Sequence, residues 1–154
     1  MNERIDTMLA WLEADRTLHL LFIRLGLAYV FIPAGWQKLM AGQEKWLWLG
    51  TQMQHFGIYF WPVGWGLAAA CAEFFGGISL LLGLGTRIGA FFIACVMVVA
   101  LVMHITNGDL FWDVWSKPLM LLIVVLFVMV FGSGKLSLDH YLAQRANNKN
   151  MEWQ

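Results

Sequence analysis

Long apolar stretches alternate with short polar ones along this chain. Four apolar stretches cover residues 18–40, 61–84, 86–106 and 115–132. Each is close to the roughly 20 residues that an α-helix needs to cross about 30 Å of hydrocarbon. The last one begins before Pro118, since proline is tolerated in the first turn of a helix. The pattern therefore predicts an all-α membrane protein, built as an antiparallel four-transmembrane-helix bundle.

Polar segments flank these spans. Residues 1–16 are mixed in charge, which predicts a cytoplasmic amphipathic helix on the membrane surface rather than a cleavable signal peptide. Asp15 or Thr17 is the expected N-cap of the first span. The tryptophan-rich loop from residue 40 to residue 59 is too apolar for water, so we expect it to lie on the membrane surface or to re-enter the membrane. Residues 143–154 form a polar cytoplasmic tail that we expect to fray.

Composition supports this fold class and sets the orientation. Hydrophobic residues make up 60% of the chain and charged residues 13%, well below the roughly 25% that is usual in soluble proteins. The formal net charge is zero, which argues against a nucleic-acid partner. The lysines and arginines outside the spans divide unevenly between the two sides: Arg4, Arg16, Arg87, Lys135, Arg145 and Lys149 on one, and Lys38, Lys45 and Lys117 on the other. The more basic side, which carries both termini, should face the cytoplasm.

Two charged residues stand inside the apolar spans. Arg24 lies in the first, and Glu73 alone among the ten acidic residues lies in the second. Each belongs to a helical stripe of small residues, a pattern that lets neighbouring helices approach closely in lipid. An unpaired charge in the middle of a bilayer costs at least about 2.5–3.5 kcal/mol, which a guanidinium–carboxylate pair would avoid. We therefore predict a buried ion pair between Arg24 and Glu73.

This predicted pair has two interpretations, which do not exclude each other. The first is a structural clasp that fixes the register of the first two helices. The second is part of a polar cavity for a ligand, an ion or a proton, because ionisable groups inside a membrane are commonly functional.

A second polar group gathers at the outer end of the spans. Lys38 ends the stripe of the first helix and His104 that of the third, and the outer loops add His55 and Trp112. The plain interpretation is a lysine that reaches the interface and an interfacial histidine. The functional hypothesis is an outer ligand pocket in which Lys38 and His104 bind a quinone carbonyl or an anion, with Trp112 as a stacking wall.

The metal-ligating residue types form no pattern of their own. The four histidines divide between the two sides without a tight two-histidine motif, so no metal site is predicted, and a haem held by His55 and His104 is a minor alternative. Cys71 and Cys95 both lie within spans, where cysteine usually acts as a small packing residue.

Several segments carry a family resemblance in their order and spacing. They read "IRLGLAYVFIPAGWQKL", "AEFFGGISLLLGLGTRIGAFF", "SKPLMLL" and "GSGKLSLD". Over residues 17–142 the chain resembles the DoxX family of small bacterial four-helix membrane proteins. The positions that carry the resemblance are Arg24, Gly26, Gly35, Lys38, Glu73, Gly76, Gly77 and Asp139. The long tryptophan-rich outer loop departs from many relatives, which leaves a shared ligand there in question.

The resemblance implies a location and two classes of function. It places the chain in the bacterial inner membrane, as a small subunit of a quinone-linked redox assembly with a redox-enzyme partner, and quinone is the one cofactor it suggests. The alternative is a membrane module that binds or transports a lipid-soluble or anionic small molecule without electron transfer. At most the chain would be a non-catalytic or quinone-site subunit of an oxidoreductase, and a homo-oligomer stays open.

Overall fold

The computed structural model describes the backbone of residues 2–151 and the side chains of residues 17–112 and 114–145. Every regular element within that range is a helix. The long helices are α1 (Asn2–Met40), α3 (Pro62–Leu82), α4 (Thr86–Thr106) and α5 (Ser116–Phe131). The shorter elements are α2 (Gln43–Thr51), a 3-10 helix η1 (Gln52–Phe56), a π-helical turn η2 (Phe111–Trp115) and α6 (Leu138–Met151).

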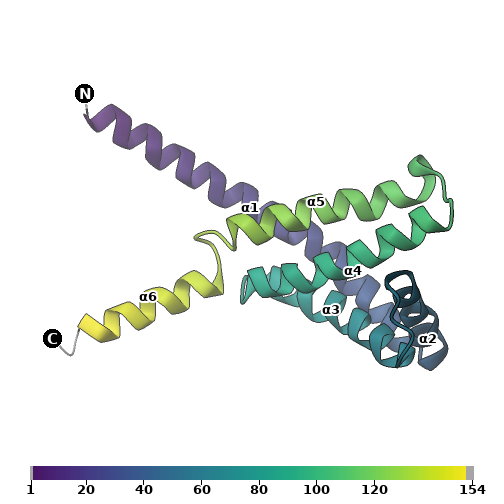
Figure 1. Ribbon diagram of the computed structural model, residues 1–154. Coiled ribbons are helices and arrows are strands. Elements are labelled where there is room, and N and C mark those ends of the chain that lie inside the picture. Colours follow the sequence, from purple (N-terminus) through teal and green to yellow (C-terminus); the bar gives the residue numbers. More distant parts are fainter. Residues whose placement is uncertain (1, 152–154) are drawn as a thin grey trace.

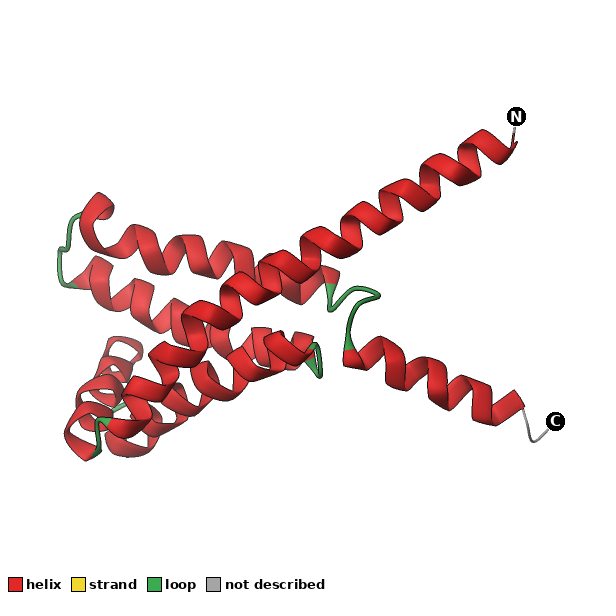
Figure 2. Cartoon of the chain, turned by 180° about the vertical axis from the view of Figure 1, so that it is seen from behind, coloured by secondary structure: helices red, strands yellow, loops and turns green. Residues whose placement is uncertain are grey.

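The long helices pack in chain order. Helix α1 packs against α3, α3 against α4 and α4 against α5, while α2 lies on α3. Successive long helices run in alternating directions, and both ends of the chain leave the packed region on the side opposite α2 (Figure 1). Seen from behind, α1 crosses the face of the other helices (Figure 2). The N-terminal part of α1 and the whole of α6 project from this region.

Small residues allow α1 and α3 to approach each other closely. A Cβ added at Gly35 would lie 2.7 Å from the Cα of Phe74, and one added at Gly77 would lie 2.9 Å from Cγ1 of Ile32. No side chain fits at these two positions, so the two backbones approach as glycine-containing helices do in membranes. These contacts also fix the register, with Gly35 level with Phe74 and Ile32 level with Gly77.

Apolar side chains occupy both the interior and the outer surface. Phe31, Leu80, Ile93, Val125 and Val128 form the centre of the core, each at most 1% exposed. Many other large apolar side chains on the same helices are exposed, among them Phe22, Tyr29, Ile88, Phe91 and Val130. A surface of this kind is stable where hydrocarbon rather than water surrounds it.

Three helical segments are long and apolar enough to cross a membrane. They are Thr17–Met40, Pro62–Leu82 and Thr86–Thr106, whereas α5 has only 16 residues. The turn η2 precedes α5 directly and extends the helical run at its outer end. Pro118 lies in the first turn of α5 and has no N–H. Because one α-helical hydrogen bond is therefore absent there, a π-helical turn just before it sacrifices little hydrogen bonding.

The structure also describes the segments that flank the spans. The predicted cap at Asp15 or Thr17 is wrong, because α1 continues through both residues without a break. The outer loop is folded: Trp46 donates from Nε1 to the Lys38 carbonyl at 2.8 Å, and a Cβ added at Gly66 would lie 2.7 Å from the Cα of Trp46. Helix α2 therefore covers the outer end of α3. The expected polar tail belongs to α6 as far as Met151.

Candidate functional site

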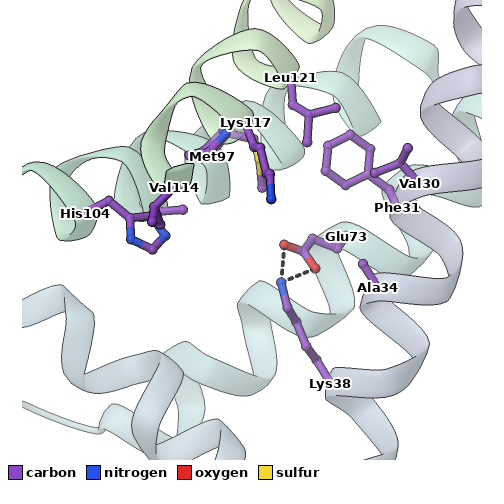
Figure 3. Close-up of a pocket in the computed structure, with 12 residues that line it drawn as sticks. Val30, Phe31, Ala34, Lys38, Glu73, Met97, His104, Val114, Lys117 and Leu121 are labelled. Atoms are coloured by element: carbon purple, nitrogen blue, oxygen red, sulfur yellow. Dashed lines mark hydrogen bonds and ion pairs between the residues drawn. The ribbon is translucent and has the colours of Figure 1, made fainter. Parts of the chain in front are cut away.

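Glu73 forms the centre of the candidate site. It lies in the middle of α3 with its side chain 1% exposed. Its partner is Lys38, from the last turn of α1, whose Nζ lies 2.5 Å from both carboxylate oxygens (Figure 3). The lysine side chain is 25% exposed, so the pair joins a fully buried carboxylate to a cation at the edge of the core. We call it the Lys38–Glu73 pair.

The predicted ion pair between Arg24 and Glu73 is therefore wrong. The register of α1 on α3 explains the error. Gly35 is level with Phe74, and Arg24 lies about 16 Å further along α1 at 1.5 Å per residue. No side chain spans that distance. Arg24 is instead level with the end of α3, and Lys38 is the cation within reach of Glu73.

Arg24 is bound by backbone oxygens at the end of the fold from which both ends of the chain leave (Figure 1). Its Nε donates to the Leu80 carbonyl at 2.9 Å, and its Nη1 donates to the carbonyls of Ser133 at 2.6 Å and Leu136 at 3.0 Å. Nη2 lies 3.4 Å from a fourth carbonyl, that of Leu81. Carbonyls at the end of a helix have no partner within the helix and attract a cation. We call this arrangement the Arg24 clasp.

Two sequence motifs meet at this clasp. "LGLGTR" ends α3 at Gly83, which adopts a left-handed φ of +69°, and "GSGKLSLD" connects α5 to α6. Asp139 holds the two segments together, because its Oδ1 accepts a hydrogen bond from Gly85 N at 3.0 Å and its own N–H donates to Gly83 O at 3.1 Å. The clasp thus connects α1 to the ends of α3 and α5.

Two cavities adjoin the Lys38–Glu73 pair. The larger, of about 450 Å³, lies among α1, α2, η1, α3 and α4, and the smaller, of about 340 Å³, lies among α1, α3, α4 and α5. Both are lined by Lys38, Glu73, Met97, Ala100 and His104. The ion pair and His104 therefore form a polar partition between two largely apolar spaces.

The four residues predicted for an outer pocket divide into two groups. Lys38 and His104 line both cavities. His55 and Trp112 line neither of them. His55 Nδ1 lies 3.1 Å from the Thr106 hydroxyl, and Trp112 is 81% exposed in the π-helical turn η2. The structure therefore does not place Trp112 as a stacking wall.

His104 has a fixed orientation at the partition. Its Nδ1 lies 2.7 Å from Oδ2 of Asp109, an acceptor, so Nδ1 carries the proton. This hydrogen bond leaves Nε2 available to a ligand.

Sequence reasoning missed two residues at the cavities. Trp65 lines the larger one, and its Nε1 is a buried donor without a hydrogen-bond partner. Lys117 lines the smaller one and points into it (Figure 3), with no ion pair to another described residue. In the sequence both look like ordinary interfacial residues, a tryptophan of the outer belt and a lysine before a span. Only the packing of α3, α4 and α5 gives them a role.

Other chemistry is sparse in the part of the chain that the structure describes. No group of three or more histidine, cysteine, aspartate or glutamate side chains there could hold a metal ion. Cys71 and Cys95 are free thiols.

The chain is similar to one family of known proteins. The model of the DoxX family matches residues 19–105, more than half of the chain. This chain belongs to the DoxX family. The matched range contains the Lys38–Glu73 pair, Arg24 and His104, whereas Lys117 and Asp139 lie beyond it. No curated protein and no solved structure matches the chain. It is a DoxX-family membrane protein with three helices long and apolar enough to span a bilayer.

Proposed function

We propose that this DoxX-family chain is a four-span protein of the bacterial inner membrane that binds a lipid-soluble quinone in its larger cavity. It serves there as the small membrane subunit of a quinone-linked redox assembly. The observation that carries the proposal is the buried, unpartnered indole N–H of Trp65 in a largely apolar cavity that the Lys38–Glu73 pair also lines.

The size and lining of the larger cavity suit such a ligand. Its volume of about 450 Å³ falls within the roughly 300–1,000 Å³ of small-molecule sites. Alanine, valine and methionine side chains of α3 and α4 line one side of it, and Trp48 adds an aromatic surface. Sites of this kind bind flat apolar ring systems and orient them through a few polar groups.

The polar groups match the two redox forms of a quinone. Trp65 Nε1 and Lys38 Nζ are donors, and quinone carbonyls are acceptors. His104 Nε2 can accept the hydroxyl proton of a quinol, because Nδ1 already donates to Asp109. The buried Trp65 donor needs an acceptor, since a buried polar group without a hydrogen bond costs about 1–3 kcal/mol.

The residues at the partition handle protons in this proposal, and a partner subunit handles the electrons. Glu73 and His104 are the titratable groups that line the larger cavity beside Lys38 and Lys45. Asp109, behind His104, is 35% exposed and connects the histidine to the surface. The chain therefore binds and orients the ligand, supplying protons when the quinone is reduced or accepting them when the quinol is oxidised, while the redox enzyme docked against it exchanges the electrons.

The path of the chain supports four spans. Helices α1, α3, α4 and α5 alternate in direction, and both termini leave on the same side (Figure 1). An even number of spans requires that arrangement. The excess of basic residues on the terminal side makes it cytoplasmic. Reporter fusions at Gln154 and within residues 42–50 should therefore report opposite sides of the membrane, and the same side from both would overturn the four-span topology.

The quinone proposal is tested by ligand retention. We expect the full chain, purified from membranes in mild detergent, to carry quinone that solvent extraction and mass spectrometry detect. Trp65→Phe should lower the retained amount about five- to tenfold, the effect of one lost hydrogen bond of roughly 1 kcal/mol. Trp112→Phe is the matched control, because that indole lies outside both cavities, and it should retain the wild-type amount. Absence of quinone in the wild type, or equal retention in the two variants, would contradict the proposal.

One observation favours a second candidate function. Lys117, Lys38 and His104 all line the smaller cavity, and among the side chains that the structure describes Glu73 is the one carboxylate that lines it. An apolar space with an excess of cations suits a small anion with an apolar body. Under this alternative the chain binds such an anion without electron transfer. Benzoate is a suitable probe: it should bind the wild type and not Lys117→Gln, and the purified chain should then carry no quinone.

A further inference from the structure

A third cavity lies beside the two already described. It has a volume of about 450 Å³ and lies among η1, α4 and α5. All of its lining side chains are apolar except the thiol of Cys95. It contains no polar group that could orient a ligand head. We call it the lateral groove.

The lateral groove opens on the surface that faces lipid in the proposed topology. Phe91, Val98 and Leu126 line it and are 52%, 38% and 39% exposed. They lie in the middle turns of α4 and α5, which places the opening at the depth of the hydrocarbon. A hydrocarbon chain can enter the groove there from the bilayer without crossing a layer of water.

The lateral groove also adjoins the larger cavity. Met53, Cys95 and Val99 line both spaces. These three side chains form the wall that the groove and the larger cavity share, so Cys95 lies between the lipid-facing surface and the cavity that holds Trp65 and the Lys38–Glu73 pair.

We propose that the lateral groove holds the hydrocarbon tail of the ligand whose polar head occupies the larger cavity. This inference rests on the proposed function and narrows the ligand class to lipids with a long apolar chain. A head bound in the larger cavity has no room there for a chain of many carbons, so the chain needs an exit. The groove provides one with matching polarity. Because lipid is as apolar as the groove, moving the tail from the bilayer into the groove gains little hydrophobic free energy. The groove instead fixes where the tail lies.

The effect of blocking the groove on quinone affinity should therefore depend on the length of the quinone tail. Val98→Trp places an indole in the groove and should weaken binding of a quinone with a long isoprenoid tail at least tenfold. Binding of the same ring without a tail should stay within twofold of the wild type, because the larger cavity is unchanged. Val130→Trp is the matched control: Val130 is an exposed valine of α5 outside the groove, and this variant should bind both ligands as the wild type does. If Val98→Trp does not fold, Leu126→Trp blocks the same groove from α5.

Each outcome of this comparison is decisive. Wild-type affinity of Val98→Trp for the long-tailed quinone would overturn the tail assignment and leave the quinone site standing. Failure of the wild type to bind either ligand would overturn the proposed function itself. A phospholipid acyl chain that stays bound in the groove when long-tailed quinone is added would also overturn the tail assignment.

Cys95 gives a second and independent readout. In a Cys71→Ala background it is the only remaining thiol, since the chain has two cysteines. A lipid-soluble methanethiosulfonate reagent should modify Cys95 from the bilayer, and long-tailed quinone should slow that modification at least fivefold. An unchanged rate with bound long-tailed quinone would show that the tail leaves the cavity by another route.

Discussion

Arg24 and Lys38 lie on the same helix, about 21 Å apart along its axis at 1.5 Å per residue, and their surroundings differ. Arg24 is 1% exposed, and four backbone carbonyls from two segments surround its guanidinium. Lys38 binds one carboxylate, and two cavities border that pair. The comparison shows that a charge inside an apolar helix does not by itself mark a functional site. What distinguishes the Lys38–Glu73 pair from Arg24 is the pair of cavities beside it.

The two side chains suit their different tasks. Guanidinium presents five N–H donors in a rigid plane, so one arginine can bind carbonyls from α3 and from the segment before α6 together. Ammonium is a compact charge on a flexible side chain, so a lysine can leave its carboxylate partner and bind a ligand instead. The clasp therefore fixes the fold at the inner end, and the Lys38–Glu73 pair stays adjustable at the outer end.

The largest expected effect is on the clasp. Arg24→Leu removes every donor from the carbonyls of Leu80, Ser133 and Leu136, and each buried unpaired carbonyl costs about 1–3 kcal/mol. We expect a loss of roughly 3–5 kcal/mol in the free energy of unfolding, measured by denaturant unfolding in detergent micelles. Arg24→Lys should recover less than half, because an ammonium cannot reach all three oxygens. Wild-type stability in Arg24→Leu would show that the clasp is dispensable.

The next effect is an asymmetry within the Lys38–Glu73 pair. Lys38→Met leaves a carboxylate that is 1% exposed without its cation, which should cost about 3 kcal/mol, less if Glu73 takes up a proton. Glu73→Gln leaves a lysine that is 25% exposed and can turn toward water, at a cost of about 1 kcal/mol. The double variant Lys38→Met with Glu73→Gln should recover most of the larger loss. Equal losses in the two single variants would mean that the lysine is as enclosed as the carboxylate.

Smaller effects should distinguish Thr86 from Trp65, whose buried polar groups both lack a hydrogen-bond partner. Thr86, at the start of α4, has a buried hydroxyl without a hydrogen bond, as Trp65 has a buried N–H. Thr86→Val should stabilise the protein by about 1 kcal/mol and leave quinone retention unchanged, since the residue lines none of the cavities described above. Trp65→Phe should be near neutral for stability and lower retention. If Thr86→Val also lowered retention, the two ends of the molecule would be coupled.

The smallest expected effect is the coupling between the two ends. A double-mutant cycle with Arg24→Leu and Glu73→Gln should give a coupling energy within about 0.5 kcal/mol of zero, because residues that share no partner act additively. The same cycle with Lys38→Met and Glu73→Gln should give a coupling of about 3 kcal/mol in magnitude. A large coupling for Arg24 with Glu73 would contradict the register of α1 on α3.

Much of this protein could be predicted from its sequence. The helices follow from apolar stretches of membrane length, and the stripes through Arg24 and Glu73 predict which faces of α1 and α3 meet. The stripe through Arg24 ends at Lys38 and the stripe of the third apolar span ends at His104, and both residues line the same cavities. These features depend on helical periodicity and on the free energy of transferring side chains out of water, which local sequence determines.

Only the tertiary structure decided which charges pair. Helical periodicity gives the face of a side chain but not its height relative to the next helix, and that height depends on where Gly35 meets Phe74 and Gly77 meets Ile32. The same register brings carbonyls more than 100 residues away to Arg24 and leaves Trp65 without a partner beside a cavity. Contacts across such separations arise from the packing of whole helices, in which a shift of one turn, about 5.4 Å, exchanges every partner.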